Sequence, residues 1–341
     1  MIAINLDERP GSFCHKWIEY CKMNDIPFKT VNCLKSNILN ELRDCDGLLW
    51  HWHHEDLRHN LIAKQILTIA EKYRGIFVFP DFNTAWHFDD KIAQTLIFDS
   101  MNVPIPNYWL FFDEEEAIRW IKDAEFPVVF KLRRGAGSAN VKMINNSSDA
   151  KKIISIMFGK GISPIKVPIG EVIKKRKLSK VRAFGFKKAW KYFRSARAFP
   201  NERGYVYFQE FIPNCTCDHR IIVIGGNKAY GFLRYTRKND FRASGSGDFL
   251  IDHTQIKDEV LEMAFQIANK LRLQCAAFDF LLSPRGFLLI EMSYGFIPAG
   301  GTYNSEWHGY WNEDLVWHEK KVDPVFLIIE NLIEQINKKN Q

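Results

Sequence analysis

Two carboxylates near the C-terminal end of the chain are predicted to face one another across a β-hairpin. Asp279 and Glu291 each stand in a short apolar segment, and the turn Ser283–Gly286 joins these segments. The turn residues favour a three-residue loop with a bulge, which would place Ser283 opposite Phe287. In that register Asp279 lies directly opposite Glu291. Like charges placed opposite one another repel, so a cation is expected between them. The two carboxylates, with the Ser293 hydroxyl on the same face, would supply part of the oxygen shell of a Mg²⁺ ion, and phosphate would supply more. A solvent-exposed face or a neutralising arginine is the alternative explanation.

Lys131 interrupts an otherwise apolar strand and therefore predicts an anion nearby. It projects to the face opposite Val128 and Phe130, and a lysine among buried strand residues usually meets a negative charge. The loop that follows contains Gly135 and Gly137, which can bring backbone N–H groups close to phosphate. A structural β-turn is the alternative, because no Gly-Lys-Ser/Thr sequence closes this loop as in a Walker loop.

The elements that position these residues change character along the chain. The first 80 residues alternate apolar segments with amphipathic ones, which predicts a small parallel α/β domain. Its expected strands are 1–6, 47–52 and 75–79, and its expected helices are 13–23 and 61–73, with a further helix from about residue 89. From residue 126 the pattern favours antiparallel strands with helices. The expected strands are 126–132, 205–212, 220–224, 230–235, 276–282 and 287–293, with helices at 257–271 and from about 324.

The composition is that of a globular protein, with 341 residues, 46% hydrophobic and 26% charged. No apolar run reaches the roughly 20 residues of a membrane span, and the charged N-terminus does not read as a signal peptide. The seven cysteines are odd in number, and their spacing shows no framework of disulfide pairs. We therefore expect reduced thiols in a cytoplasmic protein. Cys215-Thr-Cys217 lacks the second pair of ligands that a zinc site requires.

One segment carries most of the positive charge. The net charge is +7, and Lys174–Arg197 holds 11 Lys and Arg with no Asp or Glu. The rest of the chain is therefore mildly acidic. This basic insert, which also contains aromatic residues, suits an anionic partner such as a nucleic acid, an acidic sugar, a nucleotide-sugar or a membrane surface. A solvated lid helix whose aromatic residues pack on the body is the alternative.

Eight short stretches in order resemble the ATP-grasp carboxylate–amine ligases, in particular RimK-type glutamate ligases and bacterial glutathione synthetases. Each stretch alone is weak, and their order makes the resemblance specific. They lie between about residues 83 and 291 and are Asp90-Lys91, 126–131, Gly135-Ala-Gly-Ser138, Gln209–Ile212, Asp218-His-Arg220, Arg234 with Asp240-Phe-Arg242, Ala277-Phe-Asp279 and Glu291-Met-Ser293.

The resemblance implies a fold and three domains. The fold is α/β (α+β), an ATP-grasp fold in which two α+β subdomains clamp ATP beside an N-terminal parallel α/β domain. We place the N-terminal domain at 1–82, the central subdomain with the basic insert 160–200 at 83–207, and the C-terminal subdomain at 208–341.

The resemblance also implies roles for individual residues. Phosphate-binding residues would be Lys91, Lys131 and the loop residues Gly135, Gly137 and Ser138. Adenine would be held by Gln209, Glu210, Phe211 and Ile212, and ribose by Asp218. Three arginines would face the phosphates and the developing acyl phosphate, namely Arg220, Arg234 and Arg242. Metal ligands for Mg²⁺, with Mn²⁺ as a substitute, would be Asp279, Glu291 and Ser293.

The implied activity is an ATP-dependent amide-forming ligase that releases ADP and phosphate by way of an acyl phosphate. Two departures stand against a complete second magnesium site: Ser293 replaces the usual Asn, and Ala243-Ser244 follows Arg242 where an Asn is common. The expected acceptor is a small anionic metabolite or a sugar-acid precursor of a surface polysaccharide. Amino-acid addition to a protein C-terminus is an alternative, and a nucleotide- or nucleic-acid-binding protein without turnover is another.

Two aromatic segments concern the acceptor side. The segment Trp50-His-Trp-His-His54 follows an expected strand end, and loops at such ends border the ligand crevice of open α/β sheets. Trp86 and His87 precede Lys91 and are expected in the same cleft. The second segment, Tyr303–Trp311, offers rings that stack on sugars. Packing is the alternative for both segments.

Overall fold

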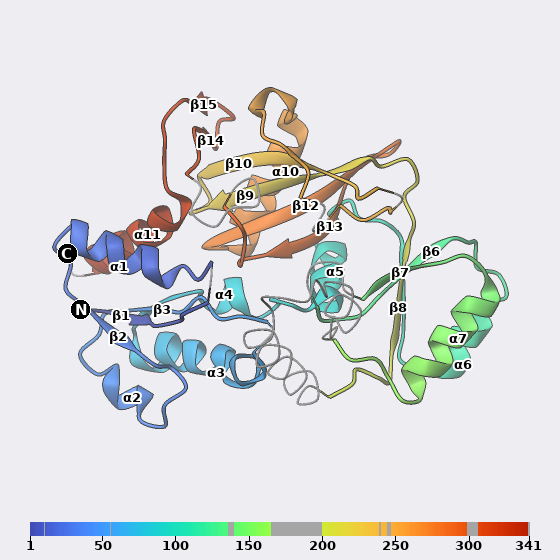
Figure 1. Cartoon of the computed structure of the whole chain (residues 1–341), viewed down its shortest axis with the longest axis horizontal. Coiled ribbons are helices and arrows are strands. Elements are labelled where there is room, and N and C mark those ends of the chain that lie inside the picture. The colour runs from blue at the N-terminus through green and yellow to red at the C-terminus, as the bar shows by residue number, and fades with distance from the viewer. Residues whose placement is uncertain are drawn as a thin grey trace, which may run out of the picture.

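The computed structural model describes residues 1–9, 11–54, 56–135, 140–164, 200–238, 240–243, 247–298 and 306–339. Three sheets organise these residues (Figure 1). The basic insert Lys174–Arg197 lies outside the described residues, so its predicted role as a lid or docking segment stays a prediction. None of the helices in these described ranges is long and apolar enough to cross a membrane.

The N-terminal residues form a parallel sheet with the strand order β2-β1-β3-β4, as the alternating pattern predicts. Its strands are β1 (Ile2–Asn5), β2 (Phe28–Val31), β3 (Gly47–Leu49) and β4 (Phe77–Phe79). The accompanying helices are α1 (Cys14–Met23), α2 (Ile38–Glu41), α3 (Leu57–Arg74) and α4 (Phe82–Ala85). The Asp56 side chain accepts from Arg58 N at the start of α3, and Gly75 ends that helix with a left-handed φ of 66°, which a residue without Cβ adopts at little cost.

The second sheet is antiparallel in the order β5-β8-β6-β7. Its strands are β5 (Tyr108–Phe111), β6 (Val128–Lys131), β7 (Val141–Ile144) and β8 (Val206–Glu210). Two helices pack with these strands, α6 (Glu114–Trp120) and α7 (Ser147–Phe158). Val128 and Phe130 enter the core of this sheet, and Lys131 projects to the other face because strand side chains alternate.

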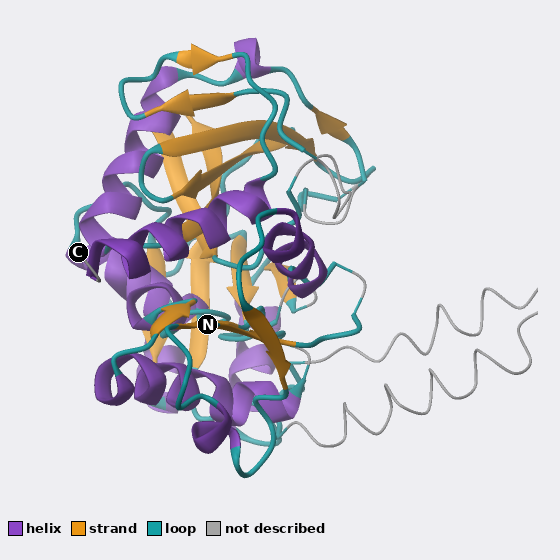
Figure 2. Ribbon diagram, turned by 90° about the vertical axis from the view of Figure 1, so that its left-hand side faces the viewer, coloured by secondary structure: helices purple, strands orange, loops and turns teal. Residues whose placement is uncertain are grey.

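The third and largest sheet carries the predicted carboxylates. Its order is β13-β12-β9-β10-β14-β15, and β11 pairs with β10. The strands are β9 (Cys217–Ile224), β10 (Lys228–Tyr235), β11 (Phe249–Leu250), β12 (Cys275–Ser283), β13 (Gly286–Ser293), β14 (Tyr310–Asn312) and β15 (Trp317–His318). Helix α10 (Asp258–Leu271) packs on one face, and a short 3-10 helix, η1 (His253–Gln255), precedes it. Figure 2 shows helices along one side of these strands.

Two helices join the three sheets into one body. Helix α5 (Lys91–Ser100) contributes Ile92 to the core of the second sheet and Phe98 to that of the largest. The C-terminal helix α11 (Pro324–Lys339) returns to the N-terminal sheet and lies beside α1 (Figure 1). Trp17 Nε1 donates to Val325 O at 3.2 Å across that contact. The first and last parts of the chain therefore share one hydrophobic core.

The β12–β13 hairpin pairs Asp279 with Glu291 as predicted, although the predicted turn was wrong. Ser283 pairs with Gly286 rather than with Phe287, so the turn has two central residues, and the Ser283 hydroxyl donates to Gly286 O at 2.9 Å. A shift of register just after Asp279 compensates and restores that residue opposite Glu291. The bulge exists, but it lies at the site rather than in the turn.

The three-domain division stays a prediction. The boundary expected after residue 207 falls within β8, whose residues pair with β5 and β6. Helix α11, expected within the C-terminal subdomain, packs on the N-terminal sheet.

Candidate active site

A cavity of about 220 Å³ lies between the second sheet and the largest one. It collects most of the residues that the sequence analysis selected from distant parts of the chain. The selected residues that line it are Lys91, Lys131, Gln209, Glu210, Phe211, Ile212, Asp218, Arg234, Arg242, Asp279 and Glu291. Because Asp279 and Glu291 line the same cavity, the carboxylate pair projects to one face of the sheet as predicted.

We call Lys91, Lys131 and Glu291 the lysine end of this cavity. Lys91 Nζ lies 3.2 Å from Glu291 Oε1. Burial lowers the pKa of Lys91, but the carboxylates of Glu291 and Asp89 outweigh burial and raise it. Lys131 is 9% exposed and makes no hydrogen bond or ion pair with any described residue. Burial lowers the pKa of Lys131 to about 8 although Glu291 acts against it. Among the described residues, the site therefore holds a buried cation without a direct partner.

We call Asp218, Arg234 and Asp279, together with Arg220, which does not itself line the cavity, the arginine end. Strand pairing sets Arg234 opposite Asp218 and Asp279 opposite Arg220. Arg220 donates to both Asp279 oxygens at 2.7 and 2.8 Å, and Arg234 donates to both Asp218 oxygens at 2.7 and 2.6 Å. Arg234 Nη2 also lies 2.7 Å from Asp279 Oδ2. Burial alone would raise the pKa of Asp279, but the two guanidinium groups hold it down at about 2. Arginine neutralisation, the alternative considered for the carboxylate pair, therefore applies to Asp279.

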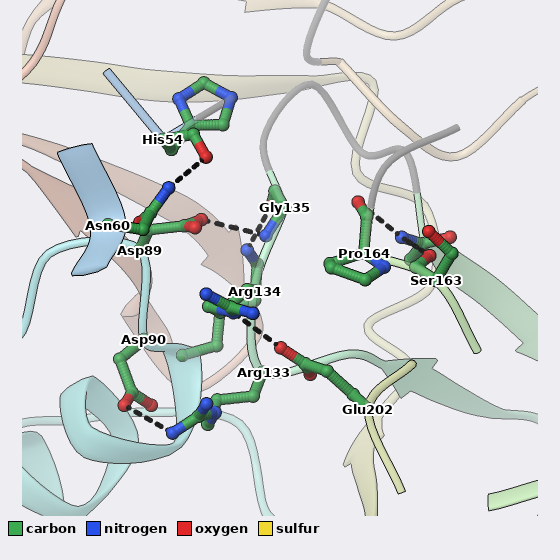
Figure 3. A network of polar contacts seen from close by, with 12 residues as sticks. His54, Asn60, Asp89, Asp90, Arg133, Arg134, Gly135, Ser163, Pro164 and Glu202 are labelled. Atoms are coloured by element: carbon green, nitrogen blue, oxygen red, sulfur yellow. Dashed lines mark hydrogen bonds and ion pairs between the residues drawn. The ribbon is translucent and has the colours of Figure 1, made fainter. Parts of the chain in front are cut away.

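Polar contacts fasten the start of the glycine-bearing loop to the N-terminus of α5 (Figure 3). Gly135 N donates to Asp89 Oδ1 at 2.8 Å, and Lys91 Nζ donates to Gly135 O at 2.6 Å. Arg133 lies 3.5 Å from Asp90 Oδ2. Gly137 and Ser138 lie outside the described residues, so their predicted phosphate contacts stay predictions.

The predicted adenine-binding residues line the cavity at the end of strand β8 and just beyond it. Gln209 is buried and donates to Tyr207 Oη at 3.3 Å. Glu210 Oε2 accepts from Asn107 N at 3.0 Å and from Arg285 Nη2 at 2.6 Å. Glu210 thereby ties the second sheet to the β12–β13 turn, and its carboxylate already has partners. Adenine binding by these residues stays a prediction.

Two predicted residues are engaged with nearby groups. Ser293 does not line the cavity, and its hydroxyl donates to Gly295 O at 2.8 Å. Arg242 lines the cavity and pairs with Asp240, with Nη2 2.6 Å from Oδ2.

The His- and Trp-rich segment follows β3 as predicted, and its first half belongs to the core. Trp50 and Trp52 are fully buried, and the His51 ring stacks on Phe13 with centroids 3.8 Å apart. Burial, together with neighbouring cationic groups, lowers the pKa of His53 to about 2. The segment also contacts the residue just beyond β13, because the Tyr294 hydroxyl donates to Trp52 O at 3.0 Å.

The described C-terminal aromatic residues pack on one another. Trp307 stacks on Tyr230 with centroids 5.1 Å apart, and Trp317 stacks on His253 at 4.2 Å. The packing alternative therefore holds for these rings, whereas 303–305 lie outside the described residues.

Sequence reasoning missed three residues that support the site. They are Asp89, Glu202 and Tyr205, none of which was selected as a site residue. Glu202 Oε1 accepts from Arg134 at 2.9 Å, and Tyr205 Oη accepts from Arg133 N at 2.9 Å while donating to the other Glu202 oxygen. The one available signal was an acidic residue two positions before Lys91.

The carboxylates of the cavity fit a magnesium ion whose other ligands come from a nucleotide. Within the described ranges no three His, Cys, Asp or Glu side chains gather as a protein-only metal site. Two opposed carboxylates match Mg²⁺, which usually takes one or two carboxylates and completes its shell with phosphate and water. Glu291 is the more available ligand, because its side chain is 37% exposed whereas Asp279 is bonded to two arginines.

Comparison with known proteins agrees with this geometry. Residues 198–295 match the family model of the RimK-like ATP-grasp domain. A probable alpha-L-glutamate ligase of Klebsiella pneumoniae is 26% identical over 133 residues, which are 38% of this chain and 44% of the relative. The chain therefore matches less than half the length of that relative.

Solved structures extend the likeness to nearly the whole chain. A RimK domain ATP-grasp protein from Sphaerobacter thermophilus has a TM-score of 0.50 at 16% identity, covering 86% of this chain and 90% of that one. The biotin carboxylase domain of the Hydrogenobacter thermophilus 2-oxoglutarate carboxylase, in complex with MgADP, ADP and bicarbonate, has a TM-score of 0.57 at 15% identity. It covers 97% of this chain and 69% of that one. The chain therefore has the ATP-grasp fold, and its second and largest sheets meet at a cavity lined by lysines and opposed carboxylates.

Proposed function

We propose that the chain is an ATP-dependent ligase that joins a carboxylate to an amine and releases ADP and phosphate. One observation carries the proposal: two lysines from different elements meet two opposed carboxylates in a single cavity. The RimK-like match and the glutamate ligase relative support the same activity. The neighbour solved with MgADP supports ATP and Mg²⁺ as the cofactors.

In the proposed reaction the substrate carboxylate attacks the γ-phosphoryl group of ATP and forms an acyl phosphate. The amine then displaces phosphate and forms the amide. Lys91 and Lys131 would bind the phosphate oxygens and stabilise the charge that builds on them during transfer. Asp279 and Glu291 would hold Mg²⁺, which supplies further neutralisation of that charge. The chain contributes positioning and electrostatics rather than a covalent intermediate.

The arginine end has a separate role in this proposal. Arg220 and Arg234 are bonded to buried carboxylates, so they fix the Asp279 side chain in one rotamer. A ligand of fixed geometry costs less ordering when the metal and nucleotide arrive. Arg242, which lines the cavity from outside this cluster, would face the transferred phosphoryl group.

We propose an amino acid as the amine, because the relative is a glutamate ligase. The carboxylate acceptor would bind between the loop after β3 and the start of α5. His54 lies near Phe88 there, with ring centroids 6.5 Å apart, and Lys64 Nζ donates to Trp86 O and Phe88 O at 2.8 and 3.3 Å. Lys64 in this region favours an anionic acceptor, which includes a small metabolite, a sugar acid and a protein C-terminus.

The experiment is release of ADP from MgATP with amino acids offered as amines and with carboxylates of the three acceptor types. Wild type should release ADP only when an amine and a carboxylate are both present. Glu291→Gln should lose at least about 100-fold in kcat/KM, whereas Glu262→Gln, on the exposed side of α10, should match wild type. Tight MgATP binding without ADP release for any pair would favour the non-catalytic alternative.

A further inference from the structure

The residue Asp89 makes a contact that the proposed chemistry does not use directly. Its backbone has a left-handed φ of 56°, a conformation that aspartate tolerates better than most residues. The turn brings the side chains of Asp89 and Lys91 to the backbone of the same residue, Gly135. Asp89 accepts the Gly135 N–H at 2.8 Å (Figure 3). Lys91 Nζ donates to the Gly135 carbonyl at 2.6 Å.

Gly135 is therefore held from both of its polar groups by one tripeptide. Its φ is +111°, and a Cβ there would meet Pro164 O at 3.1 Å, so the backbone conformation and the close packing both require glycine. Lys91 N also donates to Arg133 O at 2.9 Å. These contacts place the beginning of the loop and the Lys91 ammonium together.

The Asp89 carboxylate is well suited to this task. Burial raises its pKa to about 6, with Lys91, Arg134 and the Gly135 N–H acting against burial and Glu291 with it. The group is thus largely ionised at neutral pH, and a backbone N–H bonded to a carboxylate is stronger than a neutral hydrogen bond.

We propose that Asp89 is a positioning residue, which holds Gly135 and through it orients Lys91 toward the phosphates of the nucleotide. The inference rests on the proposed function, because it needs a nucleotide in the cavity. Asp89 itself does not touch the nucleotide. Its removal should weaken the recognition of the terminal phosphates and leave recognition of the nucleoside part unchanged.

The test measures dissociation constants of MgATP, MgADP and AMP by calorimetry. Asp89→Gly removes the acceptor and keeps the left-handed backbone, and Asp89→Asn retains an acceptor oxygen. Asp25→Gly is the matched control, because Asp25 is exposed and has a similar φ of 51°. It measures the cost of glycine at such a position, and thermal unfolding shows that each variant folds.

Asp89→Gly should bind MgATP and MgADP at least about tenfold more weakly than wild type. AMP binding should change less than about twofold, and Asp89→Asn should recover most of the loss. An equal loss for AMP and MgATP would overturn the inference, because it would show a general structural role. Unchanged MgATP binding by Asp89→Gly would also overturn it. If wild type itself does not bind MgATP, the proposed function fails, which is a distinct result.

Discussion

The two ends of the cavity both combine basic and acidic side chains, but they differ in how far these charges are paired with one another. At the arginine end both aspartates have both oxygens bonded to guanidinium groups. At the lysine end the Lys131 ammonium has no direct partner among the described residues, and burial depresses its pKa to about 8. The charges of the arginine end are thus paired by side chains of the protein, whereas the lysine end is suited to bind an anionic ligand.

The difference shows where stability and function separate. Removing one member of a buried, bonded ion pair leaves its partner charged and uncompensated. Removing a buried charge without a partner takes away a cost instead. Mutations at the arginine end should therefore mainly destabilise the fold, and mutations at the lysine end should mainly remove ligand binding.

The largest expected effect on folding is that of Asp279→Ala. It leaves Arg220 without its carboxylate partner and removes one of the two partners of Arg234. The free energy of unfolding should therefore fall by about 3–5 kcal/mol. Urea unfolding at pH 7 measures the change. Asp240→Ala is the control, because its Arg242 pair is partly exposed, and it should cost less than about 1 kcal/mol. Equal effects of the two substitutions would show that the buried pairs of the arginine end stabilise the fold no more than a partly exposed pair.

The second prediction is that replacing Lys131 stabilises the fold and abolishes nucleotide binding. Lys131→Met keeps the volume and removes the charge. The pKa of Lys131 is lowered from 10.5 to about 8, so the protonated form is disfavoured in the folded state and the cost is fully present below pH 8. Urea unfolding at pH 7 should show a gain of about 3 kcal/mol at most, while MgATP binding is lost. Lys142→Met, on the neighbouring strand and exposed, should change neither. A Lys131→Met protein that still binds MgATP would contradict the account.

A smaller effect concerns pH. Lys131 loses its proton as the pH rises through about 8, and the neutral amine attracts phosphate poorly. MgATP affinity should fall by up to about tenfold per pH unit above pH 8. Lys131→Arg should flatten this dependence because arginine keeps its charge. Titration of both proteins between pH 7 and 10 makes the comparison, and parallel profiles would assign the dependence to another group.

The smallest effect tests the link between the two sheets outside the ends. Arg285→Ala removes the partly exposed pair with Glu210, and such pairs contribute about 0–1 kcal/mol. Thermal unfolding should show a shift of a few degrees at most, and MgATP affinity should stay within about twofold. A large loss of affinity would make this contact part of the binding site.

The sequence predicted more of the site than of its surroundings. The pairing of Asp279 with Glu291 followed from two apolar segments and a turn, although the bulge lies next to Asp279 instead of in the turn. The parallel N-terminal sheet followed from alternating segments. Short elements such as β5, β7 and β14 carry too few periodic residues to be recognised alone.

Pairings between distant side chains escaped prediction. Arg234 and Asp218 share a row only because β9 and β10 have a particular register, and that register depends on the tertiary packing. The Asp89–Gly135 contact joins two loops through a left-handed backbone, which no local pattern specifies. The burial of the Trp50–His54 segment likewise follows from its neighbours Phe13 and Tyr294.

The most direct test of the central claim is thermal unfolding of wild type with and without MgATP, repeated with ATP and a chelator. If the lysine end binds phosphate and the carboxylates bind Mg²⁺, nucleotide at 100 times its dissociation constant should raise the free energy of unfolding by about 2.7 kcal/mol. The midpoint should then rise by several degrees with MgATP and much less without the metal. No shift at millimolar MgATP would contradict the claim that this cavity binds the nucleotide.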